Sequence, residues 1–153
     1  MTFVAFAFIS CNREEPTPDN PNNSDEFDTY AKIEAYCLDN GWTEKYLSIE
    51  NYSHDSFEDM NNSMELYYEN NGTLRQCRTY VDYKLFSSFS SLLEVNAPPV
   101  EGYITSFTCD NEKFGICRVG ENPYDVESGY AKFYVRRINS NKVKIFYKKC
   151  NWQ

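Results

Sequence analysis

Cysteine, histidine and carboxylate side chains are the groups with which this 153-residue chain could do chemistry. The two closest cysteines, Cys109 and Cys117, are separated by seven residues and no C-x-x-C pair exists, so no zinc site is predicted. The single histidine, His54, is expected in a solvated acidic loop, which lacks the glycine and aspartate spacing of a calcium-binding loop. The sequence also lacks a glycine-rich phosphate loop and a G-x-S-x-G elbow, so it predicts no metal and no cofactor and identifies no catalytic residue.

Cys11 is the one cysteine whose position predicts a modification. It follows an uncharged apolar run, residues 2–9 (TFVAFAFI), after which Ser10 supplies a small side chain. The run has the length of a secretory signal and is far shorter than the ~20 residues that a transmembrane helix needs. Residues 1–10 are therefore interpreted as a signal peptide.

The pair Ser10-Cys11 resembles the lipobox of bacterial lipoproteins, and the residues after it resemble a Bacteroidetes-type export signal, with Arg13 followed by Glu14 and Glu15. The resemblance covers these N-terminal residues alone. It implies that Cys11 carries a lipid and that the protein is held in the outer membrane by this lipid, on the cell surface or on the periplasmic face. An ordinary signal peptide with an unmodified Cys11 is the alternative.

The residues after the signal peptide divide into a tether and a domain. Residues 11–28 contain three prolines and one large apolar side chain, Phe27, too little to offset the entropy of ordering. Residues 29–153 are long enough for a single globular domain with its own core.

Disulfide bonds are expected in this domain because an exported protein meets an oxidising compartment. If Cys11 is lipidated, five cysteines remain, which allows at most two bridges. We expect Cys109 to pair with Cys117, across strands that turn through residues 110–115. The second bridge would join two of the remaining thiols, and the sequence does not choose among Cys37, Cys77 and Cys150.

The hydrophobic periodicity predicts an α+β fold that is predominantly antiparallel β, a curved sheet or a small barrel with one or two short helices. One helix is expected over residues 30–38, with Leu38 on its apolar face and Gly41 at its C-terminal cap. A hairpin turning at Asn40-Gly41 is the alternative for that segment. A second helix is expected over residues 85–95, with Phe86, Phe89 and Leu93 on one face, because prolines follow it.

Two hairpins are predicted from turn residues. The Asn71-Gly72 pair favours a two-residue turn, which would set Tyr68 opposite Arg75. A three-residue loop at residues 139–141 would set Val135 opposite Ile145 and Phe133 opposite Tyr147.

Charge is distributed unevenly along the chain, whose net charge is −8. Residues 128–153 contain seven basic residues and no acidic one, whereas residues 1–127 hold 23 acidic and 8 basic residues. The predicted final hairpin places six of the later residues on one outward face, here named the basic strip: Lys132, Tyr134, Arg136, Lys144, Phe146 and Lys148.

Such a strip could bind an anionic glycan, a lipid head group or an acidic protein surface, with rings stacking on sugars. The alternative is that it neutralises acidic residues of the same domain and protects an edge strand. Nucleic acid is not expected as a partner of an exported, acidic protein. Three functions remain: a membrane-anchored binding module for a glycan or protein, a small inhibitor or immunity protein that blocks a hydrolase or toxin, and a hydrolase whose paired carboxylates the sequence does not single out.

Overall fold

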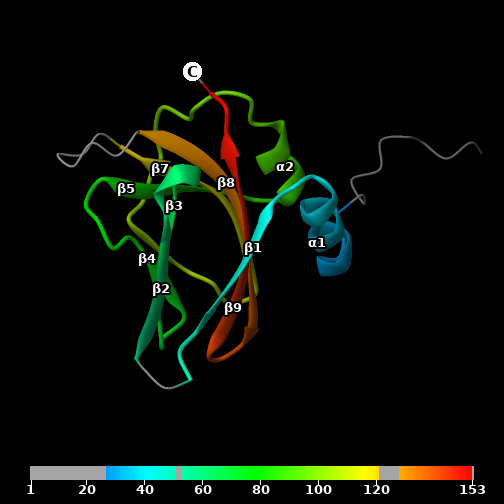
Figure 1. Cartoon of the computed structure of the whole chain (residues 1–153). Coiled ribbons are helices and arrows are strands. Elements are labelled where there is room, and N and C mark those ends of the chain that lie inside the picture. The colour runs from blue at the N-terminus through cyan, green and yellow to red at the C-terminus, as the bar shows by residue number, and fades with distance from the viewer. Residues whose placement is uncertain (1–26, 51–52, 121–127, 153) are drawn as a thin grey trace, which may run out of the picture.

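A computed structural model describes residues 27–50, 53–120 and 128–152 of the chain. These residues form two antiparallel sheets with two short helices, which confirms the predicted α+β class, and the sheets do not close into a barrel (Figure 1). The larger sheet has the strand order β1-β9-β8-β7-β5 and the smaller sheet β2-β3-β4-β6. The elements are α1 (Tyr30–Asp39), β1 (Thr43–Ser48), β2 (His54–Asp59), the 3₁₀ helix η1 (Met60–Asn62), β3 (Met64–Glu69), β4 (Thr73–Arg75), β5 (Val81–Phe86), α2 (Phe89–Glu94), β6 (Ser106–Thr108), β7 (Glu112–Val119), β8 (Gly129–Asn139) and β9 (Lys142–Cys150).

The helix α1 confirms the first predicted helix and rules out the alternative hairpin. The hydroxyl of Thr29 accepts a hydrogen bond from the backbone N–H of Lys32 at 3.4 Å, as an N-cap residue does. Gly41 follows the C-cap with a φ of +70°, a conformation that glycine adopts without strain. Ile33 and Cys37 are buried, but Leu38 is 55% exposed, so its predicted place on the buried face is wrong.

The helix α2 is shorter than predicted. Phe86 ends strand β5, and the helix begins only after Ser88, whose hydroxyl accepts a hydrogen bond from the N–H of Ser91 at 3.1 Å. The helix buries Phe89 and Leu92 instead of the predicted face of Phe86, Phe89 and Leu93. Ser88 caps the helix, and this local signal competes with the apolar spacing from which the longer helix was predicted.

The hairpin of β3 and β4 forms with a register one residue away from the prediction. Tyr68 lies opposite Leu74, and Tyr67 lies opposite Arg75. The reason is a three-residue loop in which Gly72 has a φ of +86° and donates its N–H to the carbonyl of Glu69 at 3.0 Å. The observed register brings the fully buried Tyr68 and Leu74 together, whereas the predicted one would have set the buried Tyr68 against the partly exposed Arg75.

The hairpin of β8 and β9 has the predicted register. Val135 lies opposite Ile145, and Phe133 lies opposite Tyr147. The ladder is irregular between Arg137 and Asn139, so that Asn139 pairs with Lys142 and the loop itself is shorter than the predicted three residues.

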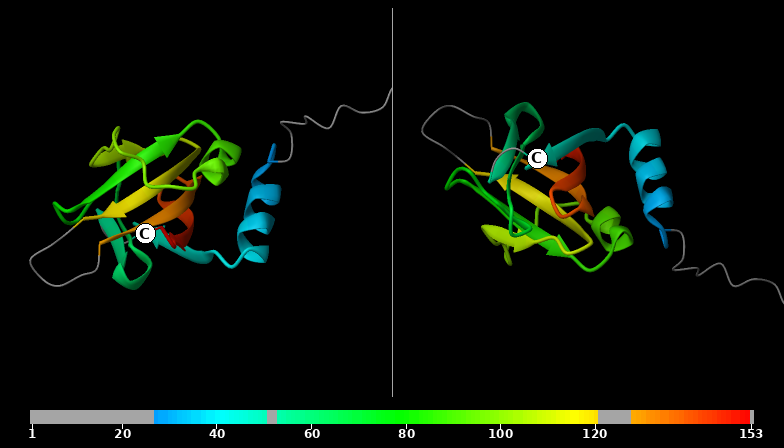
Figure 2. Two further views of the ribbon diagram at one scale, coloured as in Figure 1. Left: turned by 90° about the horizontal axis from the view of Figure 1, so that it is seen from above. Right: turned by 90° about the horizontal axis from the view of Figure 1, so that it is seen from below.

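The larger sheet is buried on both faces, which creates two hydrophobic cores. One core lies between the two sheets and includes Phe133 and Ile145. The other lies between the larger sheet and the helices and includes Tyr134, Phe146 and Phe89. Figure 2 shows α1 and α2 on the same side of the larger sheet. Because side chains alternate along a strand, successive residues of β8 enter different cores.

The predicted disulfide between Cys109 and Cys117 is not formed, and all five cysteines of the described residues are free thiols. Residues 110–115 do not turn a hairpin. Strand β6, just before Cys109, pairs with β4 in the smaller sheet, whereas β7, which carries Cys117, pairs with β5 and β8 in the larger sheet. The chain therefore crosses from one sheet to the other between the two cysteines. The second bridge expected among Cys37, Cys77 and Cys150 is absent as well.

Candidate binding site

The six residues of the basic strip lie directly opposite one another in β8 and β9, as the sequence predicted. The pairs are Lys132 with Lys148, Tyr134 with Phe146, and Arg136 with Lys144. Their predicted outward orientation is wrong, because Tyr134 and Phe146 are 0% exposed in the core beneath the helices. The strip is therefore a face of the larger sheet that α1 and α2 cover along its middle.

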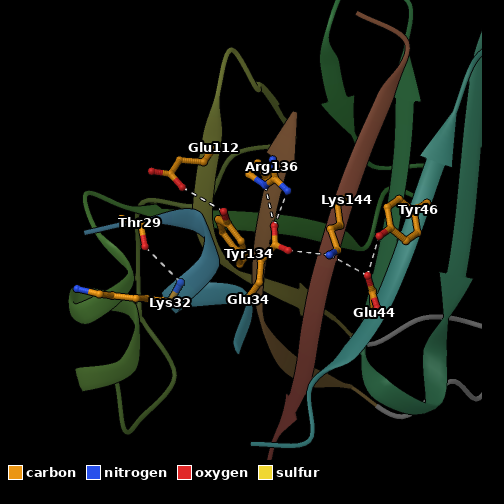
Figure 3. Close-up of polar contacts among 9 residues, drawn as sticks. All are labelled: Thr29, Lys32, Glu34, Glu44, Tyr46, Glu112, Tyr134, Arg136 and Lys144. Atoms are coloured by element: carbon orange, nitrogen blue, oxygen red, sulfur yellow. Dashed lines mark hydrogen bonds and ion pairs between the residues drawn. The ribbon is translucent and has the colours of Figure 1, made fainter. Parts of the chain in front are cut away.

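At one end of the strip, acidic side chains neutralise the basic ones. Glu34 of α1 lies 2.6 Å from the guanidinium of Arg136 and 2.7 Å from the ammonium of Lys144 (Figure 3). Glu44 of β1 approaches the same ammonium at 2.9 Å. Burial opposes the charge of Lys144, but hydrogen bonds to both glutamates outweigh it and raise the pKa of this lysine. At this end the structure supports the interpretation that the strip neutralises acidic residues of the same domain.

At the other end, the ammonium groups donate to backbone carbonyls, and these are their only partners among the described residues. Lys132 donates to the carbonyl of Leu93 at 3.0 Å, Lys148 to that of Asn40 at 2.7 Å, and neighbouring Lys149 to that of Asn61 at 2.9 Å. Burial lowers the pKa of Lys132, as expected for a cation without a counter-charge. These three positive charges are not neutralised by any ion pair within the described part of the chain.

Lys132 and Lys148 line a cavity of about 260 Å³ between the helices and the C-terminal end of β9. Lys149 also contributes to its lining, but the ammonium group of Lys149 lies on the opposite face of the sheet, at Asn61 of η1. No acidic side chain lines the cavity. The lining residues are Tyr36, Asn40, Trp42, Leu93, Lys132, Lys148, Lys149, Cys150 and Trp152. We refer to this space as the lysine cavity.

Aromatic rings form the apolar wall of the lysine cavity, and neighbouring rings hold them in place. Trp42, only 7% exposed, lies against Phe89 with 5.7 Å between ring centroids. Tyr36 meets the same Phe89 ring edge to face at 5.6 Å, and Trp152 packs on Tyr130 at 5.5 Å. A concave site that combines an aromatic wall with a few convergent polar groups is typical of small-ligand sites.

The aromatic wall was not predicted from the sequence. Tyr36 lies in α1, Trp42 follows the glycine that ends this helix, and Trp152 lies beyond the last strand. The high aromatic content of the chain, with two tryptophans, was the only hint of such a wall. No local sequence pattern connects Tyr36 and Trp42 with Trp152, which is more than a hundred residues away.

A second hollow, of about 330 Å³, is lined mainly by the segment after β4 and the start of β6. Its two guanidinium groups are already paired: Arg75 with Glu69 at 2.8 Å, and Arg78 with Glu58. The carboxylate of the fully buried Glu65 accepts the N–H groups of Cys77 and Arg78, which fixes this segment. The second hollow therefore presents no net positive charge.

His54 lies in strand β2, not in the predicted loop, and is solvent-exposed as predicted. Its ring stacks on Tyr67 with 4.8 Å between centroids.

No group of three or more histidine, cysteine or acidic side chains in the described residues could hold a metal ion. None of the described helices is long and apolar enough to cross a membrane. The lipid-attachment residue Cys11 and the export-signal residues Arg13, Glu14 and Glu15 lie outside the described residues.

Comparison of the chain with protein-family models, with curated proteins and with solved structures found no match.

Proposed function

We propose that this protein is a membrane-anchored, surface-exposed lipoprotein that binds an acidic glycan in its lysine cavity. The single observation that carries the binding proposal is the contrast between the ammonium groups of Lys132 and Lys148 at the cavity and the absence of an acidic side chain in its lining. Lys132 is a partly buried cation without a carboxylate partner in the described residues, so such a site favours an anionic ligand. The aromatic wall suits the apolar C–H faces of a sugar ring.

The membrane anchor is the second part of the proposal. It rests on Ser10-Cys11 and on the export signal at Arg13, Glu14 and Glu15. A lipid on Cys11 and the tether of residues 11–28 would hold the domain outside the cell. Growth with labelled fatty acid should label the protein, and Cys11→Ser should abolish the label; equal labelling of both would refute the anchor.

The binding proposal is tested by calorimetry with trigalacturonic acid and the neutral galactotriose. We expect the acidic sugar to bind at least about tenfold more tightly than the neutral one. Its carboxylates can accept charge-assisted hydrogen bonds from the ammonium groups, which the neutral sugar cannot do to the same extent. Lys148→Glu, at the cavity, should abolish this preference. Lys45→Glu is the matched control, because Lys45 is exposed on β1 and lies outside the cavity lining.

Equal affinity for both sugars, or an equal effect of the two charge reversals, would rule the binding proposal out. Binding to an acidic protein without binding to any acidic sugar would show that the partner is a protein.

A role as an inhibitor of a hydrolase is the second candidate, and one segment favours it. Val100 is 93% exposed and follows Pro98 and Pro99, which restrict the backbone. The segment is anchored by two 2.8 Å hydrogen bonds between Ile104 and Tyr83. A rigid loop with an apolar tip could enter an apolar pocket of an enzyme. A stoichiometric complex with a hydrolase, lost in Val100→Asp, would support this role; its retention in that variant would exclude this loop as the contact.

A further inference from the structure

The lysines of the lysine cavity differ in depth. Lys132 is partly buried, and its ammonium group is bonded to the carbonyl of Leu93 in α2. Lys148, directly opposite Lys132 in the sheet, is exposed and bonds to the last carbonyl before Gly41. The cavity therefore has an inner charge and an outer charge.

The ammonium group of Lys132, the inner charge, retains N–H donors with which it could bind a ligand. An ammonium group has three N–H donors, and the described residues engage one donor of Lys132. The Lys132 ammonium group is partly desolvated, and the backbone carbonyl of Leu93 and the thiol of Cys150 are near it. A charge-assisted hydrogen bond in such a place is stronger than one at an open surface.

The size of the lysine cavity limits what can enter it. Its volume of about 260 Å³ lies below the roughly 300–1,000 Å³ of sites that enclose drug-sized ligands. This volume suits one sugar ring with its substituents and not several rings of a chain.

Building on the proposed function, we infer that the lysine cavity binds a single acidic sugar residue at the end of a glycan chain, with the acidic group at Lys132. The ring of that residue lies against the tryptophan wall, and the rest of the chain leaves past Lys148 into solvent. Residues inside a polysaccharide carry chain on both sides, whereas of the two charges at the cavity only the outer one, Lys148, is exposed to solvent.

Calorimetry with galacturonic acid, trigalacturonic acid and long polygalacturonate tests this inference on the unaltered protein. We expect affinities per chain end that agree within about threefold, because only the terminal residue is bound. Long polymer should bind about one protein per chain end. Affinity that increases steeply with chain length, with many proteins on each polymer, would overturn end recognition while leaving the binding of acidic glycans intact.

Two variants test the position of the acidic group. Lys132→Met removes the inner charge and keeps the apolar stem, so the preference for galacturonic acid over its methyl ester should fall from about tenfold to about one. Lys148→Gln should weaken both ligands and leave the preference in place. A preference retained in a folded Lys132→Met protein would overturn the inference. Failure of every acidic sugar to bind the unaltered protein would instead refute the proposed function.

Discussion

The two ends of the basic strip have similar side chains and different surroundings. At one end, Arg136 and Lys144 face Glu34 and Glu44 at ion-pair distance. At the other end, Lys132 and Lys148 face carbonyl groups and a cavity. The same two strands thus provide a closed, neutralised end that stabilises the fold and an open, positively charged end that is available to a ligand. The difference depends on where α1 places Glu34, not on the strands themselves.

The largest effect on stability is expected at the closed end. In Glu34→Gln, Arg136 and Lys144 lose a shared carboxylate, and their side chains are only 22% and 13% exposed. Removing one partner of a buried ion pair leaves uncompensated charge, so we expect a loss of about 2–3 kcal/mol in the free energy of unfolding. Urea denaturation measures this loss. A loss below about 0.5 kcal/mol would show that the closed end is not a structural ion pair.

A smaller effect of opposite sign is expected at the inner lysine. Lys132→Met replaces a desolvated cation by an apolar side chain of similar length, so stability at pH 7 should increase by up to about 1 kcal/mol. The pKa of Lys132 is lower in the folded protein than its usual 10.5, so in alkaline solution below 10.5 the unfolded chain binds more protons. The advantage of the variant should therefore shrink as the pH rises through that range. Urea denaturation at several pH values checks this; an unfolding free energy lower than that of the unaltered protein would contradict it.

The smallest effect on stability is expected at the outer lysine. Lys148 is exposed and bonds to one carbonyl, so Lys148→Gln should change the unfolding free energy by less than about 0.5 kcal/mol. The same substitution should weaken binding of acidic sugars, which separates a binding lysine from a structural one. A large loss of stability would remove the distinction between the two ends.

The sequence predicted which residues of the strip share a face, because strand alternation and the turn at residues 139–141 fix the register locally. It did not predict that helices cover this face, because alternation does not indicate what packs on each side of a sheet. The helix α1 was predicted from its spacing and its glycine cap, which are local signals as well. Glu34, which neutralises one end of the strip, lies more than a hundred residues away from Arg136 in sequence and was not singled out.

The disulfide prediction was wrong for the same reason, because it relied on a local sequence pattern. Pairing Cys109 with Cys117 assumed a local hairpin, whereas the chain moves between sheets there. Both thiols are fully buried, and burial raises the pKa of Cys109 to about 11 and that of Cys117 to about 12. Buried thiols of this kind behave as core side chains.

Protection of Cys150 from alkylation tests the central claim most directly, because this thiol lines the lysine cavity. Iodoacetamide is added to the native protein with galacturonic acid or with neutral galactose, and mass spectrometry follows each cysteine. The exposed Cys77, in the second hollow, is the internal control. We expect the acidic sugar to slow the alkylation of Cys150 and to leave Cys77 unchanged, with no protection by galactose. Equal alkylation of Cys150 in both sugars would contradict the assignment of the lysine cavity as an anion-binding site.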